Sequence, residues 1–151
     1  MYRKILVPLD GSPTAARGLE EALGLARVTG SSLALLHVMD IMPFGMDVAS
    51  GEAWELMIES LRTSGQSLLE QARTAAREHG VATTDKMVEF PSSRVADVIV
   101  DEARDQGCDL IVMGTHGRRG FQHAMLGSDV ERVLRMSPVP VLVVRHPDAH
   151  A

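Results

Sequence analysis

The sequence predicts an α/β protein built on an open parallel sheet of five strands, in the order 3-2-1-4-5, with helices on both faces. Five short apolar runs alternate with four segments of helical spacing, which is typical of this class. Several runs are continuously apolar, as in strands buried on both faces. The residues after the first and fourth runs are rich in turn formers and are typical of loops that bind ligands. We therefore place the reversal of strand order between them, where such sheets bind ligands.

The first predicted strand, residues 5–7, is a short apolar run that ends at Pro8. Ser12 followed by Pro13 is a good helix start, because a capping side chain comes before a proline in the first turn. The apolar residues that follow keep helical spacing until Gly30. These residues predict a strand, a turn and a helix.

The second predicted strand is the apolar run 33–38. Residues 39–51 contain proline and glycine, and we expect an irregular connection there. Helical spacing then covers residues 53–79, although Gly65 could bend or break this helix.

The remaining strands are shorter or less regular. Residues 84–90 alternate weakly and are the third predicted strand, and the helix after them stops at Gly107. The fourth strand is the apolar run 109–113. A helix that begins at Gly127 leads to the fifth strand, residues 141–144.

The 151 residues are enough for one domain with a sizeable core. We expect residues 1–146 to form it and the polar tail 147–151 to be flexible. The net charge is −5, there is no long basic block, and only 3% of the residues are aromatic. These features make nucleic acid an unlikely class of partner.

No apolar run approaches membrane-spanning length, and the amino terminus has no signal-peptide pattern. We therefore expect a cytoplasmic protein that does not enter the membrane. Cys108 is the only cysteine, which excludes an intrachain disulfide. Because the histidines also lack metal-ligand spacing, we predict no transition-metal site built by the protein.

Two glycine sites flank the segment after the fourth predicted strand. Residues 114–117 read Gly-Thr-His-Gly, and Gly127-Ser128 follows after nine further residues. Close backbone N–H groups, a helix amino terminus and a hydroxyl group suit an anion, above all phosphate. A lone G-x-x-G more often only shapes a turn. Two such sites at element boundaries, with Arg118 and Arg119 between them, favour phosphate.

Three stretches of the chain resemble the ATP-binding branch of the universal stress protein family. They are Ile5-Leu6-Val7-Pro8-Leu9-Asp10-Gly11-Ser12, Leu36-His37-Val38, and residues 109–128 with both glycine sites. Residues 131–144 also fit, so the resemblance spans nearly the whole chain except for about residues 39–64. Within the family the glycine spacing is specific to members thought to hold ATP. The resemblance implies a Rossmann-like sheet of the adenine nucleotide alpha hydrolase type.

Carried over to this sequence, the resemblance implies a pocket for ATP with Mg²⁺. Pro8, Asp10 and Val38 would lie around adenine and ribose. Met113 and Gly114 would line the adjoining backbone. The residues that would approach the phosphates are Gly117, Gly127 and Ser128, with help from Arg118 or Arg119. The residues themselves predict the anion site, whereas the adenosine part comes from the resemblance alone.

Two acidic residues near this pocket have alternative roles. Asp10 either contacts the ligand or organises the turn before the first helix through an Asx-type hydrogen bond. Asp129 stands where the family usually has an apolar residue. Its carboxylate could repel the nucleotide, hold Mg²⁺ together with phosphate, or only favour the helix amino terminus.

The resemblance implies an ATP-binding module of the stress response or of signalling. The chain lacks the P-loop pattern and an evident general base or acidic pair at the phosphates, so fast phosphoryl transfer is not supported. Slow ATP hydrolysis or self-phosphorylation stays open, with Ser128 and Thr115 as candidate acceptors. The alternatives are a slow ATPase or adenylate-transferring enzyme on the same sheet and, ranked well below, a response-regulator receiver.

The fifth strand, Val141–Val144, would lie at one edge of the sheet in the proposed order. An apolar edge left open invites pairing with another strand. We therefore expect a homodimer formed by antiparallel pairing of this strand with its copy, as the family commonly shows. Such an interface is self-complementary by two-fold symmetry.

Overall fold

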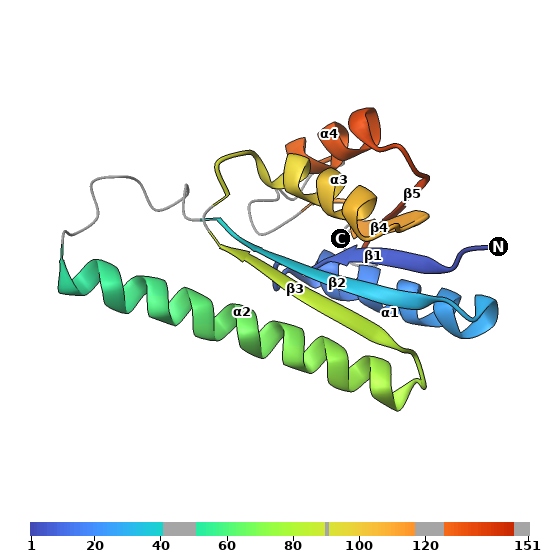
Figure 1. Cartoon of the computed structure of the whole chain (residues 1–151), viewed down its shortest axis with the longest axis horizontal. Coiled ribbons are helices and arrows are strands. Elements are labelled where there is room, and N and C mark those ends of the chain that lie inside the picture. The colour runs from blue at the N-terminus through green and yellow to red at the C-terminus, as the bar shows by residue number, and fades with distance from the viewer. Residues whose placement is uncertain (41–50, 90, 117–125, 147–151) are drawn as a thin grey trace.

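The computed structural model describes residues 1–40, 51–89, 91–116 and 126–146. Within these residues, five strands form one parallel sheet in the order β3-β2-β1-β4-β5 (Figure 1). Both the fold class and the strand order predicted from the sequence are confirmed. The elements are β1 Lys4–Pro8, α1 Pro13–Thr29, β2 Ser32–Met39, α2 Glu52–Glu78, β3 Thr83–Glu89, α3 Val95–Asp105, β4 Leu110–Gly114, α4 Ser128–Met136 and β5 Val141–Val144.

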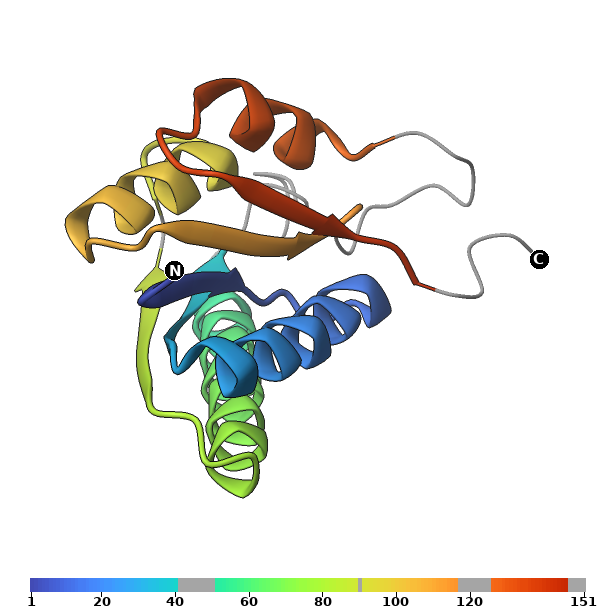
Figure 2. The ribbon, with the colours of Figure 1, turned by 90° about the vertical axis from the view of Figure 1, so that its right-hand side faces the viewer.

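The helices cover both faces of the sheet, α1 and α2 on one and α3 and α4 on the other (Figure 2). Successive residues of a strand point to opposite faces, and β1 shows the result. Ile5 and Val7 pack in the core under α1 and α2, whereas Leu6 packs in the core under α3 and α4. All three side chains are fully buried. The continuous apolar runs in the sequence thus serve two cores.

The start and end of α1 follow the sequence signals. The Ser12 hydroxyl accepts a hydrogen bond from the backbone N–H of Ala15 at 3.2 Å, and Pro13 occupies the first helical position. Gly30 ends the helix in the left-handed conformation, with φ of 74°. Because these signals are local, the sequence was sufficient to place this helix.

Helix α2 is a single helix that runs from Glu52 through Gly65 to Glu78, so Gly65 does not break it. The glycine instead allows the backbone of α2 to come close to the sheet. A Cβ atom at Gly65 would lie 2.6 Å from the ring of His37 and 2.8 Å from the sulfur of Met87. Helix α2 can therefore lie directly on β2 and β3 at this point.

Strand β1 lies at the centre of the sheet between β2 and β4. Because the sheet is parallel, the carboxyl ends of these three strands lie at one edge, which we call the carboxyl edge. The loops after β1 and β4 begin there, and these are the loops that the sequence predicts to bind a ligand. Most of the predicted irregular connection falls on residues 41–50, outside the described residues, as do Phe90 and the tail 147–151.

Candidate functional site

The predicted site residues that the structure describes come together at the carboxyl edge. Pro8 ends β1, Val38 lies near the end of β2, and Gly114 ends β4. Gly127 precedes α4, which begins at Ser128. Three other predicted residues, Gly117, Arg118 and Arg119, lie outside the described residues.

The turn between β1 and α1 is held from within. The carboxylate of Asp10 accepts a hydrogen bond from the backbone N–H of Ser12 at 2.9 Å, and Gly11 between them has φ of +81°. This geometry confirms the Asx-type role of Asp10 that the sequence offered as an alternative. Contact between Asp10 and a ligand stays a prediction.

The same turn is also held to β2. The backbone N–H of Leu9 donates to the carbonyl oxygen of Leu36 at 2.8 Å. The carbonyl oxygen of Leu9 accepts a hydrogen bond from Nδ1 of His37, also at 2.8 Å. Because His37 is only 7% exposed, this hydrogen bond is shielded from water. His37 is not among the site residues predicted from the sequence, where only its place beside Val38 points to it.

The end of β4 packs against the start of α1. The hydroxyl of Thr14 donates to the carbonyl oxygen of His116. A Cβ atom at Gly114 would lie 2.6 Å from the carbonyl carbon of Thr14, so only glycine fits there without a shift. Thr14 joins the adenosine side of the predicted site to its phosphate side. Thr14 is not among the residues predicted from the sequence, because nothing in its spacing indicates a contact across the sheet.

The two glycine sites meet in space. The backbone N–H of Gly127 donates to the carbonyl oxygen of Thr115 at 2.9 Å. A Cβ atom at Gly127 would lie 3.3 Å from Cα of His116. The chain therefore leaves β4 at Thr115 and returns to the same point at Gly127. The described residues on either side of 117–125 are therefore joined by a backbone hydrogen bond.

Helix α4 begins directly after Gly127. Its N-cap residue is Gly127, which has no side chain to accept hydrogen bonds from the first turn. The first backbone N–H groups of a helix need acceptors from outside it, and an anion can supply them. Ser128 and Asp129 are exposed on this first turn. The arrangement can bind an anion, and the Asp129 carboxylate adds negative charge beside it.

An ion pair holds α4 against α3. Nε of Arg132 donates to the carboxylate of Asp97 at 2.7 Å, and this hydrogen bond keeps the pKa of Asp97 below its ordinary value. This contact therefore joins the middle of α4 to α3. Among the described residues, no group of three histidine, cysteine or acidic side chains is placed to hold a metal ion.

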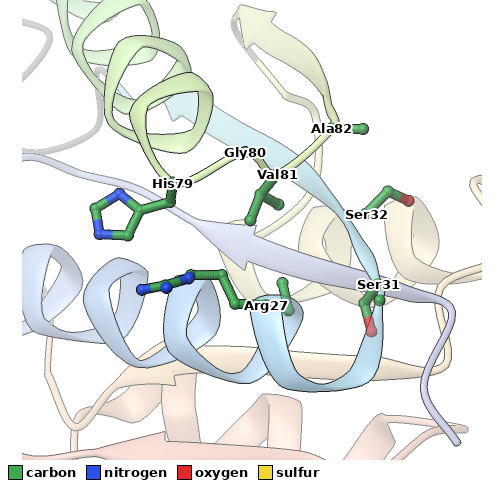
Figure 3. Close-up of a pocket in the computed structure, with 9 residues that line it drawn as sticks. Arg27, Ser31, Ser32, His79, Gly80, Val81 and Ala82 are labelled. Carbon is green, nitrogen blue, oxygen red and sulfur yellow. The ribbon is translucent and has the colours of Figure 1, made fainter.

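A separate pocket of about 370 Å³ lies at the opposite edge of the sheet (Figure 3). The turns after α1 and α2 line it, and the side chains of Arg27 and His79 are among those that line it. Both helices end here, and helix carboxyl ends favour cations. The two side chains therefore suit the helix ends. None of the predicted site residues that the structure describes lines this pocket.

Helices long and apolar enough to cross a membrane do not occur in the described part of the chain.

Comparison with known proteins gives consistent matches over the length of the chain. The model of the universal stress protein family matches residues 1–145. The universal stress protein MJ0531 of Methanocaldococcus jannaschii is 37% identical over 147 residues, which cover 97% of this chain and 84% of that protein. The solved structure of the hypothetical protein MJ0577, from the same organism, is 30% identical with a TM-score of 0.84, covering 98% of this chain and 99% of that one.

A more distant solved structure is that of the universal stress protein from Archaeoglobus fulgidus in complex with dAMP. It is 24% identical with a TM-score of 0.65, and the match covers 95% of this chain and 98% of that one. At this identity the likeness is one of fold.

Proposed function

Because the chain belongs to the universal stress protein family, we propose that residues 1–146 form a cytoplasmic ATP-binding module of the stress response or of signalling. The nucleotide, with Mg²⁺, occupies the carboxyl edge of the sheet. The observation that supports this proposal is the start of α4, which has no side-chain cap and is held beside the end of β4 by the hydrogen bond from Gly127 N–H to the carbonyl oxygen of Thr115. The backbone N–H groups of the first turn of α4 are donors that a phosphate group can accept from.

The adenosine moiety binds on the side of β1 and β2. The residues that we assign to it are Pro8, Asp10, Val38, Met113 and Gly114, which lie at the carboxyl ends of three neighbouring strands or directly after them. The A. fulgidus protein, which shares the fold, has a structure in complex with dAMP, and this supports an adenine nucleotide as the ligand.

The phosphates bind on the side of β4 and α4. We assign them to Gly117, Gly127 and Ser128, with Arg118 or Arg119 as the cationic partner. Asp129 follows directly and is exposed. Mg²⁺ between Asp129 and the phosphates would remove their mutual repulsion, which is why we include the metal.

Calorimetric titration of the protein with ATP and with GTP, each with Mg²⁺, tests the proposal. We expect binding of ATP and a preference for it over GTP. Ser128→Glu places a second carboxylate at the proposed phosphates on an exposed position, and acidic residues suit a helix amino terminus. The variant should therefore keep its fold and lose most of its affinity for ATP.

The matched control is Ser67→Glu, which adds the same charge on the exposed face of α2. We prefer Ser128 to Gly127 for this test. A Cβ atom at Gly127 already comes within 3.3 Å of His116, so a larger side chain there would disturb the loop itself. If the wild type binds no nucleotide at millimolar ATP with Mg²⁺, the proposal is wrong.

We further propose that the module is a homodimer, formed through the edge strand β5. Among the described residues, this strand has no neighbour in the sheet on its outer side, and it consists of four apolar residues.

A further inference from the structure

His37 occupies an unusual position for a core residue. It lies on β2 with 7% of its surface exposed, and Nδ1 of its ring is 2.8 Å from the carbonyl oxygen of Leu9. A carbonyl oxygen can only accept, so Nδ1 carries the proton and donates it. The residue before His37 accepts a hydrogen bond from the N–H of Leu9 at 2.8 Å. Both backbone polar groups of Leu9 are therefore fixed by two consecutive residues of β2.

Leu9 directly precedes the turn that we assign to the nucleotide. Asp10 follows it, and the Asp10 carboxylate is held by the N–H of Ser12 at 2.9 Å. Val38, also assigned to the nucleotide, follows His37 and packs toward the opposite face of the sheet. His37 thus lies between two assigned contacts without being one itself.

Helix α2 fixes the ring from the other side. A Cβ atom at Gly65 would lie 2.6 Å from Cδ2 of His37 and 2.9 Å from its Nε2. The ring is therefore in direct contact with the backbone of α2, with the sulfur of Met87 also beside that backbone. Packing of this kind restricts a side chain to one orientation. Here that orientation aims Nδ1 at Leu9.

We propose that His37 is a positioning residue for the nucleotide, through which α2 sets the place of the Leu9 carbonyl and hence of the turn that carries Asp10. This inference rests on the proposed function and adds a route by which α2 controls the site. A histidine that only filled the core would contribute to stability alone. If His37 positions the turn, variants that lose its hydrogen bond to Leu9 should also lose nucleotide affinity, and variants that keep the bond should keep the affinity.

Two substitutions at His37 separate these roles. His37→Asn keeps an N–H donor near Nδ1 but loses the ring, whereas His37→Leu keeps most of the apolar bulk but loses the donor. We expect His37→Leu to weaken ATP binding by up to about tenfold, which is the limit reached if ordering the turn on binding has to replace one hydrogen bond of ordinary net strength. His37→Asn should retain most of the affinity even where it is the less stable variant. AMP should follow ATP, because the turn faces the adenosine moiety.

His79→Leu is the matched control. Nδ1 of His79 also lies 2.7 Å from a backbone carbonyl oxygen, that of Ala75, but at the opposite edge of the sheet. This variant should bind ATP as the wild type does.

Gly65→Ala tests the part of α2. The new methyl group should displace the ring and weaken ATP binding, and it should weaken it less in a His37→Asn background, where no ring is displaced. Hydrogen exchange of the amides from Leu9 to Ala15 in the nucleotide-free protein should be faster in His37→Leu than in His37→Asn.

The outcomes are distinct. A wild type without nucleotide affinity refutes the proposed function, and the inference with it. A wild type that binds ATP while His37→Leu and His37→Asn lose affinity only in step with stability refutes the inference alone. Equal exchange rates in the two variants would do the same.

Discussion

In the proposed ATP complex, Asp129 would stabilise its helix but repel the nucleotide. It lies exposed in the first turn of α4, where a carboxylate interacts favourably with the helix dipole. A carboxylate about 5 Å from a triphosphate costs on the order of a few kcal/mol at an intermediate dielectric. Because Asp129 is exposed, we expect the lower part of that range, about 1 kcal/mol.

Asp129→Val should therefore strengthen ATP binding several-fold in the absence of Mg²⁺ and reduce the dependence of binding on Mg²⁺. Calorimetric titration of both proteins with ATP, once with Mg²⁺ and once with EDTA, measures this. If Asp129 only supports the helix, affinity will stay the same and the melting temperature will fall. Equal affinities in all four titrations would contradict the electrostatic role.

Glu102 is a buried carboxylate whose charge depends on its neighbours. Burial raises the pKa of Glu102, but hydrogen bonds from Lys86 and Gln106 outweigh it and hold the pKa below the ordinary value of 4.5. A carboxyl group with a lowered folded-state pKa contributes stability above its unfolded-state pKa. That contribution is lost as the pH falls through the folded-state pKa.

Lys86→Met should destabilise the protein by about 1 kcal/mol at pH ~7, because the Glu102 carboxylate then stays buried with one partner fewer. The difference from wild type should shrink as acid protonates the carboxylate. Urea unfolding at neutral pH and near the pKa of Glu102 measures both effects. Arg104→Met, which removes an exposed ion pair with Asp101, should change little at either pH.

At the scale of elements, the contact between β4 and α1 depends on Gly114. A Cβ atom there would lie 2.6 Å from the carbonyl carbon of Thr14, which is backbone and cannot move aside cheaply. We expect Gly114→Ala to destabilise the protein by about 1–3 kcal/mol and to weaken nucleotide binding. Gly24→Ala in α1 is the control, since a Cβ atom there meets nothing within 4 Å. It should stabilise the helix by about 0.5–1 kcal/mol, as thermal unfolding would show.

These elements also show what a sequence can predict. The bounds of α1 follow from Ser12, Pro13 and Gly30, because caps and breakers act on their own neighbours. Gly65 suggested a break in α2, but the tight packing of the helix against His37 requires a glycine there. Thr14 was likewise missed, since its partner is 102 residues away in the sequence. Contacts that depend on tertiary packing leave no local pattern.

At the scale of the whole molecule, the two outermost strands of the sheet, β3 and β5, differ in how they are protected from pairing. The edge strand β3 has the sequence TTDKMVE, and its acidic side chains pair with α2 through Arg62–Glu89 at 2.7 Å and Arg73–Asp85 at 3.0 Å. Charged residues and a covering helix protect an edge from pairing. The opposite edge strand, β5, has four apolar residues and no charge of its own. A second copy of the chain therefore has one suitable edge to pair with.

The hydrogen bonds of β5 show which of its backbone groups face away from β4. The carbonyl oxygen of Pro140 accepts a hydrogen bond from Ile111 of β4, and that of Val144 accepts one from Thr115 directly after β4. Since backbone groups alternate in direction along a strand, the N–H of Val143 points away from β4. Antiparallel pairing of two β5 strands would use this N–H as a donor. Removing the N–H of Val143 should therefore weaken the proposed interface through its backbone hydrogen bonds.

Val143→Pro removes that N–H, and proline is tolerated on an edge strand where the N–H faces outward. We expect the variant to be a monomer that keeps its secondary structure, whereas the wild type is a dimer by light scattering. A lysine at this position would be less informative, because the Val143 side chain packs against the core under α3 and α4. The control is Leu134→Lys, which removes an exposed apolar side chain from α4 without changing the edge. A monomeric wild type, or a Val143→Pro variant of unchanged mass, would show that β5 is not the interface.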